Sequence, residues 1–178
     1  MASKGQEFIE YDFVNRLAFT DLIDKAVDQI GDLRFAMGEI ARDWFKSNNV
    51  IFQLQSAGGW SDFKNEASHR AKINAVGFDY PLLMRDGLLA ASLTNPRHPY
   101  AINIPSKFDV VVGTTVEYAI HHQFGTKFMD ARPPVFIGPE SKAFASKDQA
   151  NKGGRLTRWT NIVEGYVQRV LDANGMGK

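Results

Sequence analysis

Apolar residues that recur at three- and four-residue steps predict two long amphipathic helices, one toward each end of the chain. The first is expected from Asp21 to Lys46, with Thr20 as its N-cap and Asn48-Asn49 as its end. The second is expected from Leu156 to Leu171. Its apolar face comprises Trp159, Ile162, Val163, Tyr166, Val167 and Val170. Each face needs a surface to pack on, so both helices should cover a common core.

Shorter apolar runs between the two helices predict strands. Tyr100–Ile104 and Phe108–Val112 are rich in β-branched and aromatic residues, and Pro105-Ser106-Lys107 between them predicts a hairpin turn. Val135–Ile137 is expected to be a further strand, and Phe8–Phe13 a first strand. The predicted fold class is therefore α+β: a small antiparallel sheet packed by a long N-terminal helix and a C-terminal helix.

Three shorter segments complete this expectation. Glu66–Val76 is predicted to be a short helix, and Leu88–Leu93 fits either a strand or a helix. Glu117–Phe124 is expected to be a short helix that Gly125 ends, after a strand that Gly113 closes. In the polar loop around Trp60, an aromatic residue more often anchors the loop on the domain than stacks on a ligand.

Length and composition narrow the class of protein. A chain of 178 residues fits one domain, residues 1–178, with 1–7 and 172–178 expected to be flexible termini. A net charge of +1 argues against a protein that coats nucleic acid. The absence of cysteine excludes disulfides and thiolate metal sites. The chain shows neither a signal-peptide core nor an apolar run near ~20 residues, so we expect synthesis in a cytoplasm and no membrane partner.

The adjacent histidines His121 and His122 are the first candidates for catalytic or metal chemistry. Neighbouring residues lie ~100° apart around a helix, so one ion cannot readily take both. A zinc-binding pair prefers i, i+4 spacing, and His69 and His98 lie in unrelated contexts. No nucleophile elbow or phosphate-binding loop is recognisable. We therefore expect no enzyme, catalytic residue, metal or cofactor, and a DNA-acting metal-dependent enzyme using His121 or His122 is the less favoured alternative.

A loose basic cluster lies before and within the second long helix, opposed by Glu140 and Asp148. Such clusters most often keep a protein soluble. The alternative is contact with DNA phosphates or with the acidic rim of a partner. The cluster comprises Lys142, Lys147, Lys152, Arg155 and Arg158.

Residues 110–138 concentrate aromatic, β-branched, glycine and proline signals more densely than any other part of the chain. Within them, Arg132 stands between apolar neighbours in a turn that Pro133 and Pro134 stiffen. Its planar guanidinium can hold a carboxylate with two hydrogen bonds. Arg132-Pro133-Pro134 is therefore predicted to dock a neighbouring subunit or another partner.

Other residues of the same stretch are expected to support that turn. Tyr118, Phe124 and Phe136 each lie among apolar neighbours and are predicted to anchor the core beneath partner-facing loops. His122 and Gln123 are predicted to hydrogen-bond nearby backbone. On this interpretation the stretch is a packed structural unit.

The order of these segments resembles a known family. Tyr118-Ala119, His122–Gly125 and Ala131-Arg132-Pro133 resemble the phage virion-morphogenesis, or tail-completion, family of Mu-like and related contractile-tailed phages. Two upstream segments agree: Arg85–Leu93 is similar to the family's TGxLxxSL segment, and Gly58-Gly59-Trp60 to its glycine-then-tryptophan element. The chain departs from the family at two positions. Asp86 stands where threonine is usual, and Pro134 where an aromatic residue is usual.

The resemblance implies a structural virion protein of the phage neck or tail end, a tail-completion or tail-terminator protein made in the host cytoplasm. It implies a homomeric ring, commonly a hexamer, around the DNA channel that joins tail to head. Its partners would be tail-tube and neck or connector proteins, and non-specific contact with DNA in the channel is left open. The alternative is an assembly factor absent from the mature virion. The interface candidates are Tyr118, His122, Gln123, Phe124, Arg132, Pro133 and Pro134.

Overall fold

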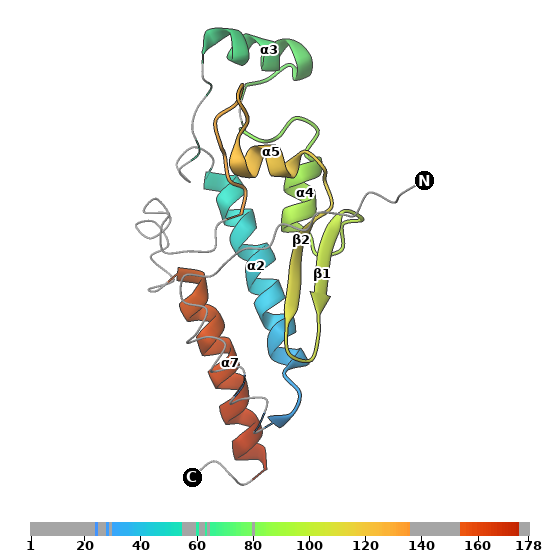
Figure 1. Ribbon diagram of the computed structural model, residues 1–178, viewed down its shortest axis with the longest axis vertical. Coiled ribbons are helices and arrows are strands. Elements are labelled where there is room, and N and C mark those ends of the chain that lie inside the picture. The colour runs from blue at the N-terminus through green and yellow to red at the C-terminus, as the bar shows by residue number, and fades with distance from the viewer. Residues whose placement is uncertain are drawn as a thin grey trace.

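The computed structural model describes residues 24, 28, 30–54, 60, 63, 65–79, 81–135 and 154–174. The described chain combines helices with a small antiparallel sheet, a long helix in its N-terminal half and a C-terminal helix, which confirms the α+β class (Figure 1). The elements are α2 (Arg34–Leu54), α3 (Glu66–Val76), α4 (Leu88–Thr94), β1 (Ala101–Pro105), β2 (Val110–Thr114), α5 (Ala119–Phe124) and α7 (Gly154–Ala173).

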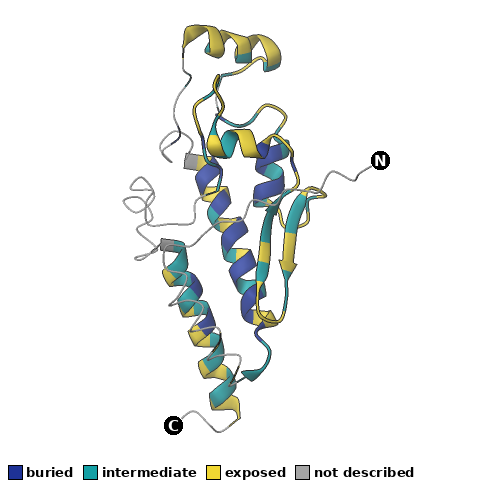
Figure 2. Ribbon diagram, in the orientation of Figure 1, coloured by how far each residue is buried: buried dark blue, intermediate teal, exposed yellow. Residues whose placement is uncertain are grey.

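Helix α2 is the centre of the described fold, with α7 along one side and the β1–β2 hairpin along the other (Figure 1). Figure 2 shows that the buried residues gather on α2 and α4. Burying one large apolar side chain contributes roughly 1.5–3 kcal/mol relative to leaving it exposed, so this surface is a major source of stability. On α2 the buried residues are Ala36, Met37, Ile40, Ala41, Trp44, Phe45, Asn48, Ile51 and Phe52.

Both ends of α2 differ from the sequence-based prediction. Asp24, Asp28 and Ile30 are helical, as predicted, but Gly31 has a φ of 73°, which a continuous helix cannot contain, so the predicted helix is interrupted there and α2 begins at Arg34. The side chain of Asp32, two residues before α2, accepts a hydrogen bond from the Arg34 N–H (2.9 Å) and so satisfies one of the free backbone donors at the start of the helix. The predicted end at Asn48-Asn49 was also wrong. The buried Asn48 side chain donates to the Leu93 carbonyl (3.1 Å), and α2 continues to Leu54.

The strands form the expected hairpin, displaced slightly along the chain. Ala101 lies opposite Thr114 and Pro105 opposite Val110, in an antiparallel register. Gly113 does not close β2 as predicted, but lies inside the strand. The Leu33 backbone N–H donates to the Lys107 carbonyl (3.0 Å), so the hairpin turn is tied to the start of α2.

Two further helices complete the core. The segment that fitted either a strand or a helix is α4, of which Leu89, Ala90, Ser92 and Leu93 are buried. In α7 Trp159 and Val163 are buried, and Ile162, Tyr166 and Val167 of the predicted apolar face pack against the core. Asp172 and Ala173 are helical, so the C-terminal element extends into residues that were expected to be flexible.

Several sequence predictions fall on parts of the chain that the structure does not describe. The strand expected at Phe8–Phe13 and two residues of the strand expected at 135–137 lie outside the described residues. Val135 itself is described and is not in a strand. Among the described helices, none is both long and apolar enough to cross a membrane.

Candidate functional site

Three of the segments that resemble the tail-completion family are joined by hydrogen bonds beyond the C-terminal end of α2. The indole N–H of Trp60 donates to the Pro133 carbonyl (2.8 Å). The Gln123 amide donates to the Val135 carbonyl (3.1 Å) and accepts from the Val135 N–H (3.3 Å). The Arg132 N–H donates to the His122 carbonyl (2.8 Å). Segments far apart in the sequence therefore form one unit, which we call the cap.

Two sequence predictions are confirmed in the cap. Trp60 anchors its loop as expected: only 3% of it is exposed, and its ring meets the Phe52 ring edge-on with centroids 5.3 Å apart. Gln123 binds nearby backbone through both ends of its amide. His122 contributes its backbone carbonyl to the same network, whereas its side-chain Nδ1 is buried without a hydrogen-bond partner among the described residues.

The fourth similar segment, which contains Asp86, lies next to the cap. The Asp86 carboxylate accepts from the Leu88 N–H at the start of α4 (3.0 Å), from the position just before the N-cap residue Gly87. Burial raises the pKa of Tyr118, and the nearby Asp86 carboxylate raises it further. Tyr118 at the start of α5 is thus close to the start of α4.

Gly125 is a position where the chain requires glycine. Its φ is 75° and its ψ is −179°, a conformation that side-chain-bearing residues rarely adopt. A Cβ atom there would lie 2.8 Å from the Ala131 nitrogen and 2.9 Å from the Met129 carbonyl oxygen. The chain then makes a tight turn in which the Thr126 N–H donates to the Met129 carbonyl (2.8 Å). As predicted, Gly125 ends α5.

The aromatic residues of the cap are not where the sequence placed them. Phe124 is 62% exposed and Phe128 is 77% exposed, so the prediction that Phe124 fills the core was wrong. Tyr118 is also 36% exposed and does not anchor the core. In α5 the buried residue is Ala119, and helical spacing puts Ile120 and Phe124 together on the outer side. Phe136, the third predicted anchor, lies outside the described residues.

The prediction that Arg132 docks a partner was also wrong. Its residue exposure is only 9%, and its guanidinium lies over the Phe63 ring, 5.6 Å from the centroid. Pro134 is buried, and the Pro133 carbonyl is taken by Trp60. The turn is therefore held inside the chain and does not present a free guanidinium to a partner. A stiff proline-containing segment can pack against its own domain as readily as it can point into solvent. Here the cation–π contact between Arg132 and the Phe63 ring favours packing against the domain.

The two adjacent histidines lie in different environments. His121 is exposed, whereas His122 is partly buried and its ring meets the Tyr118 ring edge-on at 5.8 Å. Burial lowers the pKa of His122 to about 4, and the positive charges of Arg132 and His121 add to this effect. His122 is therefore neutral at neutral pH. Among the residues that the structure describes, no three histidine, aspartate or glutamate side chains gather in a way that could hold a metal ion.

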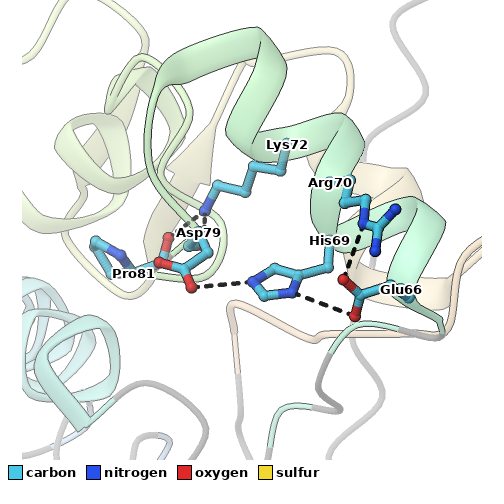
Figure 3. Close-up of polar contacts among 6 residues, drawn as sticks. All are labelled: Glu66, His69, Arg70, Lys72, Asp79 and Pro81. Carbon is cyan, nitrogen blue, oxygen red and sulfur yellow. Dashed lines mark hydrogen bonds and ion pairs between the residues drawn. The ribbon is translucent and has the colours of Figure 1, made fainter.

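A polar cluster ties α3, which has no buried residue, to the loop that follows it (Figure 3). The Lys72 ammonium donates to the carbonyls of Asp79 and Pro81, each at 2.6 Å, and burial lowers its pKa. His69 lies 3.0 Å from the Asp79 carboxylate and stacks on Phe63, with centroids 5.0 Å apart. The sequence analysis did not predict this cluster. Its charges are spaced as on any solvated helix, and only the turn after α3 brings Asp79 back to them.

The described members of the predicted basic cluster are not a free surface. Arg158 binds the Asp43 carboxylate with Nε (3.0 Å) and Nη2 (3.1 Å), and Nη2 also donates to Ser47 (2.7 Å). Arg155 donates to the buried Asn48 side chain (2.6 Å). Both arginines therefore join α7 to α2, which corrects their assignment to DNA or a partner. The other three members, Lys142, Lys147 and Lys152, lie outside the described residues.

Comparisons of the chain with protein-family models, with curated proteins and with solved structures find no match. A functional assignment therefore rests on the motif residues themselves and on the geometry that they adopt.

Proposed function

We propose that this protein is a structural component of the virion of a tailed phage, a tail-completion or tail-terminator protein. In this proposal it forms a homomeric ring around the DNA channel and joins the tail to the head. The observation that carries the proposal is the cap. Trp60, Gln123 and Arg132 come from three separate segments that resemble the family, and hydrogen bonds join all three into one unit.

The outer surface of the cap supports a role in assembly. Phe124 and Phe128 are the two most exposed large apolar residues in the described chain. They are four residues apart in the chain, and phenylalanine, which is enriched in interface cores, is seldom left so exposed without a partner. The Thr126–Met129 turn holds Phe128 in a fixed backbone, so little conformational entropy is lost when it binds. We assign this surface to the contact with a tail-tube or neck protein.

The mechanism in this proposal is assembly without covalent chemistry. A ring of identical subunits needs a heterologous contact that repeats around an axis and closes. The exposed aromatic surface of each cap would then point to the same end of the ring, where several copies act together. Multiple weak contacts of this kind produce tight joining because each one raises the effective concentration of the next.

Native mass spectrometry and light scattering test the ring. We expect a closed oligomer, either of the protein alone or after the tail-tube protein is added. A strict monomer under both conditions would contradict the proposal. Purified virions provide the second test: absence of the protein from them would favour the alternative, an assembly factor that leaves before the particle matures.

Complementation of a phage that lacks the protein tests the exposed surface of the cap. The double substitution Phe124→Ser and Phe128→Ser should leave the protein folded but give heads and tails that fail to join, as seen by electron microscopy. Val50→Ser changes a residue of α2 that is 45% exposed and is the matched control. Normal virion yield from the double variant would show that this surface is not the contact.

A further inference from the structure

The β1–β2 hairpin has an apolar face that points away from the core. Ile104 lies opposite Val111 and Ile102 opposite Gly113, and the side chains of these pairs share one face of the sheet. Ile104 is 60% exposed and Val111 is 47% exposed. Phe108 in the turn is 44% exposed. The other face carries the residues that pack on the core. We call the surface of Ile102, Ile104 and Val111 the hairpin face.

Leaving the hairpin face in contact with water is energetically unfavourable for a protein that acts alone. A two-stranded sheet is marginally stable by itself, and its unpaired strand edges invite pairing with other chains. Exposed aliphatic residues that lie together commonly mark a binding surface. The hairpin face therefore calls for a partner surface that is also partly apolar.

A groove of about 510 Å³ lies between α2 and α7. Phe35 forms part of it, stacks on Tyr166 with centroids 5.7 Å apart, and is still 55% exposed. Glu39 and Arg169 place opposite charges beside the apolar residues. The lining residues are Phe35, Glu39, Asn161, Ile162, Gly165 and Arg169.

The two surfaces are placed so that one copy can meet the next side by side. The hairpin and α7 lie on opposite sides of α2 (Figure 1). The hairpin turn and the groove are also near the same end of α2. The Lys107 carbonyl of the turn accepts a hydrogen bond from the Leu33 N–H, and Leu33 is only two residues before Phe35, which lines the groove. A contact between these surfaces would set neighbouring subunits side by side, as a ring requires.

Charge supports the same pairing. The hairpin turn exposes Lys107 and Asp109, one positive and one negative residue. The groove carries Glu39, whose carboxylate lies 2.7 Å from the Arg42 guanidinium, and Arg169, whose Nε donates to the Gly165 carbonyl (3.1 Å). In a contact between the two surfaces, Lys107 would share Glu39 with Arg42, and Asp109 would face Arg169, around an apolar centre. An apolar centre with a complementary charged rim is the usual composition of a specific interface.

We propose that the hairpin face of one copy docks into the α2–α7 groove of the next copy, and that this contact repeats around the ring. The inference rests on the proposed function and goes further by naming both surfaces of the subunit contact. The contact is heterologous, because different surfaces of the same chain meet, and such a contact generates a ring when the rotation closes. It leaves the aromatic surface of the cap free for another virion protein.

Cross-linking tests this contact directly because the chain contains no cysteine. Ile104→Cys puts a thiol on the hairpin face, and Asn161→Cys puts one in the groove. We expect a short bismaleimide to link the two variants when they are mixed, and neither variant to itself. A chain that carries both substitutions should give a ladder that ends at the size of the closed ring. Arg70→Cys on α3, whose side chain is 72% exposed, is the control that should not link to either.

The outcomes separate this contact from the proposed function. A ring that forms by native mass spectrometry but shows no link between Ile104→Cys and Asn161→Cys would overturn the contact alone. A link of Ile104→Cys to itself would show a symmetric pairing of hairpins and would also overturn it. A chain that remains monomeric with and without the tail-tube protein would contradict the proposed function as well.

Substitutions without a cross-linker give an independent test. Ile104→Asp should weaken self-association about tenfold or more, because an aliphatic side chain that becomes buried in the contact is replaced by a charge. Lys107→Glu and Glu39→Lys should each weaken it by up to about fivefold, as for a rim charge pair. The double charge exchange should restore the loss. Circular dichroism should show each variant folded, and a double variant weaker than either single variant would refute the pairing of Lys107 with Glu39.

Discussion

Removing the Asp43 carboxylate tests whether α7 is held on α2 by a largely buried ion pair. Arg158 binds Asp43 with Nε (3.0 Å) and Nη2 (3.1 Å), and the Trp159 indole N–H donates to the same carboxylate (2.9 Å). The side chains of Arg158 and Asp43 are only 16% and 20% exposed. Asp43→Ala therefore takes a shared acceptor from a guanidinium and an indole in a place that water reaches poorly.

The expected loss of stability lies between two limits. Removing one partner of a buried ion pair costs about 3–5 kcal/mol, whereas an exposed pair contributes about 0.2–1 kcal/mol. At 16% and 20% exposure this pair is nearer the buried limit, and we expect Asp43→Ala to lower the free energy of unfolding by about 2–4 kcal/mol. Asp43→Asn keeps one oxygen acceptor and the volume of the side chain, so it should cost about half as much.

Urea unfolding followed by tryptophan fluorescence measures these losses, because Trp159 lies at the site. The control is Glu66→Ala, which breaks an i, i+4 pair with Arg70 whose side chains are 68% and 72% exposed and should cost at most about 0.5 kcal/mol. A double-mutant cycle of Asp43→Ala with Arg158→Ala should give a coupling of about 1–3 kcal/mol. If Asp43→Ala costs no more than Glu66→Ala, the clamp between α2 and α7 does not stabilise the fold and the reasoning fails.

Three further predictions concern the cap. Gly125→Ala should lower the free energy of unfolding by at least about 2 kcal/mol in a urea titration, because it adds strain and a clash with Ala131; an unchanged midpoint would contradict the backbone geometry. Phe124→Ala should change the thermal midpoint little, because the ring is 62% exposed, whereas a loss of about 3–5 kcal/mol would mean that the ring is buried. Stability should fall as pH drops from about 6.5 toward about 4, because unfolded chains protonate at His122 before the folded state does, and His122→Gln should flatten that slope.

The sequence by itself determined the elements whose pattern is local. The apolar face of the C-terminal helix, the short helices at Glu66–Val76 and before Gly125, and the hairpin were all predicted and are present. Each depends on periodicity, on glycine conformation or on the β-branched residues of neighbouring strands, which are properties of a few adjacent residues. That Trp60 and Gln123 bind backbone groups also follows from the kinds of side chain they carry, because buried donors and acceptors must be satisfied, although their partners at Pro133 and Val135 are set by the tertiary structure.

Only the tertiary structure decided which side of each short element faces inward. Phe124 had apolar neighbours in sequence, yet the six-residue helix α5 buries Ala119 instead, because a short helix can bury only one narrow side. Arg132 and Arg158 looked like partner-facing charges, and both are held by groups distant in sequence, a Phe63 ring and an Asp43 carboxylate. The sequence contains those partners but does not say how far away they are. The same local sequence pattern is compatible with a solvated charge and with a paired one, and the packing of α2 against its neighbours decides which is formed.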